Sequence, residues 1–213
     1  MPVPEDTAGG DELAHYFSPR PGGTGARTTV PVVLAGHELE VVTAGGVFSA
    51  DRVDLGTRVL LREAPVPPAA GDLLDLGCGW GPVALALGLL APQATVWAVD
   101  VNKRALELTA ENARRARLTR VRAVPPEAVP DDVRFAAIWS NPPIRVGKEA
   151  LHALLLQWLP RLLPGAAAHL VVQRNLGADS LHAWLTVALA GSATVERAGS
   201  AKGYRVLRVT AAG

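Results

Sequence analysis

Cysteine is almost absent from the sequence, which has one, Cys78, among 213 residues. A lone cysteine excludes an internal disulfide and a zinc site made of several cysteines, and it is typical of a reducing compartment. Apolar runs of the roughly 18 residues that a membrane-spanning helix needs are also missing. The first residues lack the basic and apolar regions of a signal peptide. We therefore expect a soluble, cytoplasmic protein with no membrane partner and no bound metal.

A large net charge is missing as well, because 21 Lys and Arg side chains stand against 20 Asp and Glu, a formal charge of +1. This balance does not indicate a strongly basic protein that wraps nucleic acid. Lysine occurs only at positions 103, 148 and 202, so nearly all cations are arginine, whose planar donor fork suits phosphates and base edges. Two arginine-rich segments, Arg114–Arg117 and Arg120–Arg122, predict either a local basic patch or an ordinary polar helix end.

The organisation of the chain favours one main domain with an N-terminal addition, since 213 residues with 49% apolar side chains can bury one core. Residues 1–27 contain proline, glycine and acidic side chains, so we expect a flexible segment. Residues 28–63 predict a β-hairpin, with apolar runs at 29–34 and 38–43, followed by a short helix within 51–63. We expect this part to pack as an extension and lid on a main domain of residues 64–213.

The main domain alternates strands with helices. Apolar runs predict strands at 72–76, 95–100, 121–124, 136–141 and 169–173, and helical spacing predicts helices at 82–90, 103–117, 148–163 and 179–189. Continuous apolar strands indicate a parallel sheet covered on both faces. The last two strands, 193–198 and 204–210, have no helix between them and should pair antiparallel. The expected fold class is α/β: a Rossmann-like, seven-stranded, mostly parallel sheet with an antiparallel C-terminal hairpin and an N-terminal β-hairpin extension.

A glycine-rich turn, Asp75-Leu-Gly-Cys-Gly-Trp-Gly81, follows the first strand of the main domain and opens a helix. Its glycines let the backbone approach a ligand closely. A dinucleotide fingerprint would need a third glycine where Pro82 stands, and a phosphate loop would need Gly-Lys-Ser/Thr. Asp100 ends the next strand, where a carboxylate can accept hydrogen bonds from both hydroxyls of a ribose. The alternative is a purely structural turn with a helix-capping aspartate.

This turn resembles motif I of the class I methyltransferases, in which the glycines lie against the methionine part of S-adenosylmethionine (SAM) and the acidic residue contacts its amino group. The resemblance implies SAM as the cofactor. The residues implied to bind it here are Asp75, Gly77, Cys78, Gly79, Gly81, Asp100 and Val101. We interpret Cys78 as a small residue tolerated in the turn, because a nucleophile would need an activating base nearby.

Asn141-Pro-Pro143 falls where the fourth strand of the main domain should end, beside the expected cofactor. An exocyclic amine conjugated to a ring or carbonyl is a poor nucleophile, because its lone pair is delocalised. The Asn141 side-chain carbonyl and the Pro142 backbone carbonyl can accept its two N–H bonds and aim the lone pair at a methyl carbon. We therefore predict Asn141 and Pro142 as the catalytic pair; the alternative is a simple strand-ending turn.

Taken together, the motifs resemble those of the small-domain methyltransferases related to the 16S ribosomal RNA guanine-N2 methyltransferases. The resemblance covers nearly the whole chain, through segments 15–18, 46–49, 54–57, 75–81, 99–102, 141–148 and 202–204. It implies that residues 48–57 form a lid and wall, with Gly56, Thr57, Glu127 and Asn141 also touching the cofactor. The substrate residues that it implies are Phe48, Pro143, Ile144, Arg145 and Lys148.

Three departures from the family pattern are visible. Ile144 stands where many amine methyltransferases have an aromatic residue that stacks on the flipped base, so stacking would come from Phe48 or Tyr16. Ala136 replaces a frequent aspartate before the apolar part of its strand. Glu127 lies in a proline-containing loop that would reach the adenine amine. Long members of the family also carry a second, degenerate domain, which we do not expect here.

The sequence thus favours methylation of guanine N2 in ribosomal RNA, with ribosomal RNA or the small ribosomal subunit as partner. Adenine N6 or a glutamine amide of a protein is the first alternative. A small-molecule methyltransferase or a SAM-binding protein without catalysis is the second.

Overall fold

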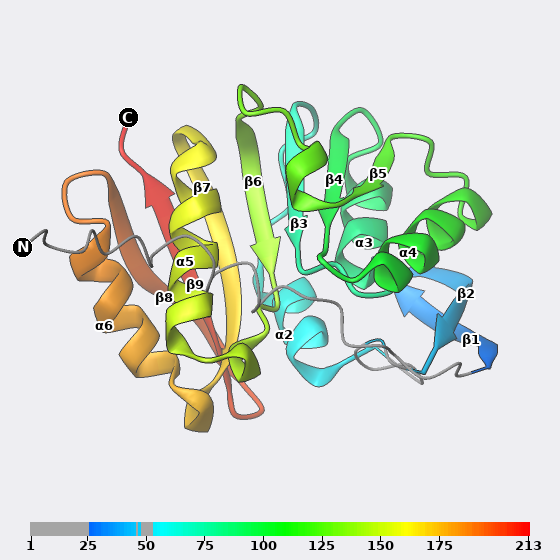
Figure 1. Cartoon of the computed structure of the whole chain (residues 1–213), viewed down its shortest axis with the longest axis horizontal. Coiled ribbons are helices and arrows are strands. Elements are labelled where there is room, and N and C mark those ends of the chain that lie inside the picture. Colours follow the sequence, from blue (N-terminus) through cyan, green and yellow to red (C-terminus); the bar gives the residue numbers. More distant parts are fainter. Residues whose placement is uncertain (1–25, 46, 48–52) are drawn as a thin grey trace, which may run out of the picture.

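The computed structural model describes residues 26–45, 47 and 53–213. Its centre is a seven-stranded sheet with the order β5-β4-β3-β6-β7-β9-β8 (Figure 1). The strands are β3 (Asp72–Leu76), β4 (Thr95–Val99), β5 (Val121–Val124), β6 (Phe135–Ser140), β7 (Leu162–Gln173), β8 (Ala193–Ala201) and β9 (Tyr204–Ala211). Neighbours pair in parallel except where β9 pairs antiparallel with β7 and β8. The predicted fold class is therefore confirmed, including the antiparallel C-terminal hairpin.

Helices cover both faces of this sheet. Helices α5 (Lys148–Trp158) and α6 (Ala178–Ala188) bury leucines against one face, and α2 (Leu55–Glu63) and α3 (Pro82–Leu90) pack on the other. Helix α4 (Lys103–Arg115) packs against α3 and the N-terminal hairpin. The central strands β3, β4, β6 and β7 bury apolar side chains on both faces, and this burial accounts for their continuous apolar runs. None of the described helices is long and apolar enough to cross a membrane.

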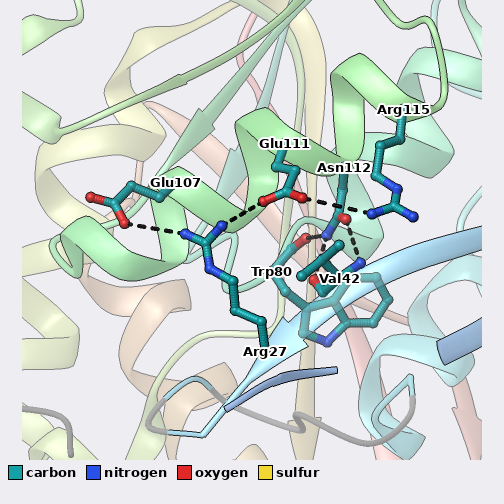
Figure 2. A network of polar contacts seen from close by, with 7 residues as sticks. All are labelled: Arg27, Val42, Trp80, Glu107, Glu111, Asn112 and Arg115. Carbon is teal, nitrogen blue, oxygen red and sulfur yellow. Dashed lines mark hydrogen bonds and ion pairs between the residues drawn. The ribbon is translucent and has the colours of Figure 1, made fainter. Parts of the chain in front are cut away.

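The N-terminal hairpin consists of β1 (Arg27–Leu34) and β2 (His37–Ala44), and buried polar contacts fix it to α4. Figure 2 shows Asn112, 1% exposed, donating from Nδ2 to the carbonyl oxygens of Val42 and Trp80, both at 2.9 Å. Its Oδ1 accepts the N–H of Val42 at 2.7 Å. Nearer the surface, Glu111 pairs with Arg27 at 2.8 Å. One buried amide therefore joins the hairpin to the end of the glycine turn.

The expected boundary between the helix at 148–163 and the strand at 169–173 was wrong. The helix predicted at 148–163 ends at Trp158, a 3-10 turn follows at Leu159–Arg161, and β7 begins at Leu162. Pro160 lacks the N–H that a continuing helix would need, whereas the flanking leucines keep helical spacing and hide the boundary. The helix predicted within 51–63 has Asp54 as its N-cap, and residues 48–52 lie outside the described part.

Candidate active site

A cavity of about 400 Å³ lies at the carboxyl edge of the sheet, where β3, β4 and β6 end. Carboxyl ends of parallel strands meet at one edge, so motifs far apart in sequence converge there. Of the predicted residues, those that line the cavity are Thr57, Asp75, Gly77, Cys78, Gly79, Asp100, Asn141, Pro142, Pro143 and Ile144. The central residues of the predicted site thus line the same cavity.

The glycine turn is folded over the end of β4. The N–H groups of Gly77 and Cys78 both donate to the carbonyl of Val99, at 2.8 and 3.0 Å. Gly77 and Gly79 have φ values of 81° and 58°, in the left-handed region that favours glycine. The turn therefore presents bare backbone to the cavity. Cys78 is buried, and burial raises the pKa of its thiol well above the usual value, which disfavours the thiolate.

Asp75 places a buried carboxyl group at the floor of the cavity. It is 1% exposed, and its Oδ2 accepts the N–H of Ala84 in α3 at 2.9 Å. Burial, with a smaller effect of the nearby Asp100, raises the pKa of Asp75 to about 8, while that hydrogen bond acts in the opposite direction. A ligand cation at this point would restore the ionised form, so the site suits a positively charged amino group.

Asp100 is held by backbone donors rather than by cations. Its Oδ2 accepts the N–H of Gly79 at 3.0 Å, and its Oδ1 accepts the N–H of Asn102 at 2.8 Å. Burial raises the pKa of Asp100, while these hydrogen bonds oppose the rise. The N–H of Val101 also lowers this pKa, and a carboxylate can accept about four hydrogen bonds, so Asp100 keeps the capacity to accept a hydroxyl hydrogen from a ligand.

Asn141 is oriented by two acceptors at the start of α2. Its Nδ2 donates to Asp54 Oδ2 at 2.9 Å and to Thr57 Oγ1 at 3.1 Å. The carboxylate of Asp54 only accepts hydrogen bonds, so the amide nitrogen must face it, and both amide hydrogens are used. The polar atom of Asn141 that is left to meet a ligand in the cavity is Oδ1, an acceptor.

Asp54 lines the cavity, although the sequence singled it out only as part of the implied lid and wall at residues 48–57. Its Oδ2 also accepts the N–H groups of Gly56 and Thr57, at 2.7 and 3.2 Å, and so caps α2. Gly56 does not line the cavity; a side chain there would meet Tyr204 Cε1 at 2.9 Å. Tyr204, in the 202–204 segment of the resemblance, also lines the cavity. An N-cap signature before the helix was the available signal for Asp54, but its bond to Asn141 spans 87 residues.

The Asn-Pro-Pro segment forms a tight turn at the cavity wall. The N–H of Ile144 donates to the carbonyl of Pro142 at 2.9 Å, which occupies one of its two lone pairs. The carbonyl of Pro143 accepts the N–H of Val146 at 3.2 Å in a 3-10 turn at Ile144–Val146. The Pro142 oxygen therefore keeps one lone pair for a ligand.

Several predicted residues lie elsewhere. Val101 is 41% exposed, Glu127 is exposed on a 3-10 turn at Pro126–Ala128, and Gly81 caps α3; none of the three lines the cavity. Lys148 lines a second, smaller hollow. Phe48 and Tyr16 lie outside the described residues, as does the side chain of Arg145. In the part of the chain that is described, no three His, Cys, Asp or Glu side chains are grouped to hold a metal ion.

Comparison with known proteins identifies a family to which the chain is similar. The family model described as methyltransferase small domain matches residues 38–208. The uncharacterized protein YbxB of Bacillus subtilis is 34% identical over 169 residues, which cover 78% of this chain and 84% of that protein. Ribosomal RNA small subunit methyltransferase C of Aeromonas hydrophila is 34% identical over 145 residues, covering 65% of this chain and 39% of the relative.

Ribosomal RNA large subunit methyltransferase G of Pseudomonas syringae is 33% identical over 146 residues, again 65% of this chain and 39% of the relative. The chain thus spans well under half the length of the named ribosomal RNA methyltransferases. A T. thermophilus 16S rRNA N2 methyltransferase, solved in complex with AdoMet and guanosine, has a similar fold, with a TM-score of 0.73 at 24% identity. That match covers 87% of this chain and 50% of the other.

Proposed function

Because the chain belongs to the methyltransferase small domain family, we propose that it transfers a methyl group from SAM to an exocyclic amine of ribosomal RNA, with guanine N2 as the favoured acceptor. Relatives named for the small and the large ribosomal subunit both support ribosomal RNA as the substrate class. The complex of a structurally similar protein with AdoMet and guanosine supports the cofactor and the base.

The cavity fits SAM in three respects. Its buried Asp75 would be ionised by a cation and would bind the amino group, Asp100 can still accept from a ribose hydroxyl, and the glycine turn allows close contact with backbone. Gly56, Gly81, Val101 and Glu127 would act indirectly or not at all, since they do not line this cavity. Bound SAM supplies a methyl group on a sulfonium, which an amine lone pair can attack.

The main support for the proposal is the orientation of the Asn141 side chain. With Nδ2 held by Asp54 and Thr57, its Oδ1 is an acceptor fixed at the cavity, and the remaining lone pair of the Pro142 carbonyl is a second one. Two acceptors match the two N–H bonds of a primary aromatic amine and repel a carbonyl oxygen. They draw electron density to the nitrogen and fix its direction, which lowers the barrier by positioning and preorganised dipoles.

Local charge near the cavity supports a polyanionic substrate. Arg174, Arg197 and Arg205 line one open hollow, and Arg174 directly follows Gln173, a wall residue of the cavity. Asp179 pairs with both Arg197 and Arg205, whereas no ion pair involves Arg174 within the described residues. These cations come from three elements, so the sequence did not reveal them. The arginine-rich segment 114–122 lies instead where α4 leads into β5, at the opposite edge of the sheet.

The proposal is tested with SAM that carries an isotopically labelled methyl group. Purified protein is incubated with this SAM and with free ribosomal RNA or assembled subunits, and the nucleosides are analysed by mass spectrometry. We expect label in a nucleoside with the wild type and none with Asn141→Ala. Label in ribosomal protein with unlabelled RNA would refute an RNA substrate.

A further inference from the structure

A second hollow of about 170 Å³ lies next to the cavity, between α5 and α6. Ile144 and Leu176 line both the hollow and the cavity. A ligand that fills the cavity can therefore continue into the hollow across these two side chains. The hollow has less than half the volume of the cavity, which suits one planar ring system.

The hollow contains a stacked aromatic pair. His152 of α5 and Trp184 of α6 have ring centroids 3.5 Å apart and planes inclined by 4°. Both side chains are half-buried, so part of their surface faces the hollow. Desolvation lowers the pKa of His152, and the adjacent Lys148 lowers it further, so the imidazole is uncharged at neutral pH. Uncharged flat side chains are what nucleobases stack on in RNA-binding sites.

Cationic and polar groups accompany the pair. Lys148, exposed at the start of α5, and Ser180 of α6 line the same hollow. A lysine can contact a phosphate as a point charge, and a hydroxyl can bond a base edge. The hollow thus combines a stacking surface, a cation and a hydrogen-bonding group beside the cavity.

We propose that this hollow binds the base of a nucleotide adjacent to the methylated one, with that base against an outer face of the stacked His152–Trp184 pair and its phosphate near Lys148. The inference rests on the proposed function and adds a sequence-reading subsite to it. In this arrangement Ile144, which stands where many amine methyltransferases have an aromatic residue, lies between the target base and its neighbour.

The test uses a short RNA fragment around the nucleotide that the labelling experiment maps. The fragment is made in its natural form and with an abasic residue at either neighbour of the target. For the wild type, we expect one of the two abasic fragments to lower kcat/KM by about 5- to 150-fold, the range that base–aromatic stacking supplies. In His152→Leu and Trp184→Leu, the same abasic residue should change kcat/KM less than threefold, since the contact is already lost.

Val187→Ala is the matched control, because Val187 lies on the same helix and is 78% exposed. It should keep the wild-type sensitivity to the abasic residue. SAM affinity should be unchanged in all variants, since none of these residues lines the main cavity, and this also reports folding. If Trp184→Leu does not fold, His152→Leu decides alone.

Two results would overturn the inference: a wild type indifferent to both abasic residues, or variants as sensitive as the wild type. In either case the RNA is still methylated, so the proposed function stands. Absence of label from all RNA in the earlier experiment would instead remove both.

Discussion

Asp54→Ser tests whether the Asp54–Asn141 contact positions the amine acceptor. Serine is also a strong N-cap residue, so the cap of α2 should survive, and the free energy of unfolding should fall by no more than the ~1.5–3 kcal/mol of the lost bond to Asn141. Its hydroxyl is one bond nearer the backbone than a carboxylate oxygen and cannot reach the Nδ2 of Asn141. The amide then keeps only its bond to Thr57 Oγ1 and can rotate.

The size of the effect follows from the bond that is lost. A hydrogen bond to a charged group contributes about 1.5–3 kcal/mol. If that energy holds the acceptor in place during transfer, kcat falls by roughly 10- to 150-fold. Asp54→Asn keeps an oxygen at the same place in a neutral hydrogen bond, worth about 0.5–1.5 kcal/mol, and should recover part of the loss.

The assay measures kcat, SAM affinity and thermal stability for the wild type and both variants. We expect Asp54→Ser to stay folded and keep near-normal SAM affinity while kcat falls, and Asp54→Asn to lie between it and the wild type. Equal activity of Asp54→Ser and wild type would refute the positioning role. A loss of SAM affinity that accounts for the whole effect would show that the residue serves the cofactor instead.

The remaining predictions concern four residues. Asn141→Ala should bind SAM normally in calorimetry but lose transfer; unchanged transfer would contradict its role. Asp100→Ala should weaken SAM binding by about 1.5–3 kcal/mol in the same assay, and unaltered affinity would exclude the ribose contact. The pKa of Asp75 is about 8 in the folded protein, against an ordinary value of 3.8. The free energy of unfolding without SAM should therefore fall as pH rises from 4 to 8, by at most about 1.4 kcal/mol per pH unit. Denaturant titrations at several pH values should show a weaker pH dependence of this free energy for Asp75→Asn. Asn112→Leu removes three buried hydrogen bonds to the backbone of Val42 and Trp80 and should lower the free energy of unfolding by roughly 3 kcal/mol or more; a loss below 1 kcal/mol in denaturant titration would show that the hairpin docks without them.

The local features of the site could be predicted from the sequence. The glycine turn follows a strand and precedes a helix, and this local geometry is enough to place Asp75, Gly77 and Gly79 at the cavity. Asp100 and Asn141 follow their own strands, and a parallel sheet brings such ends together. These positions needed no knowledge of side-chain packing.

Contacts between distant segments could not be predicted in the same way. The Asp54–Asn141 and Asn112–Val42 hydrogen bonds join residues 87 and 70 positions apart, and no periodicity encodes such pairs. Glu127 was placed at the cofactor by resemblance alone, and its loop carries it away from the cavity wall. The stacked His152 and Trp184 depend on how α5 and α6 pack, which their separate sequences do not specify.

The most direct test of the central claim is the position of the transferred methyl group. RNA methylated with SAM that carries a deuterated methyl group is digested, and the labelled nucleoside is identified by tandem mass spectrometry against synthetic standards. The two acceptors at Asn141 and Pro142 predict label on an exocyclic amine, as N2-methylguanosine. Label on a ribose oxygen, a ring nitrogen or a base carbon would contradict the account, because none of those atoms carries two N–H bonds for the two acceptors to hold.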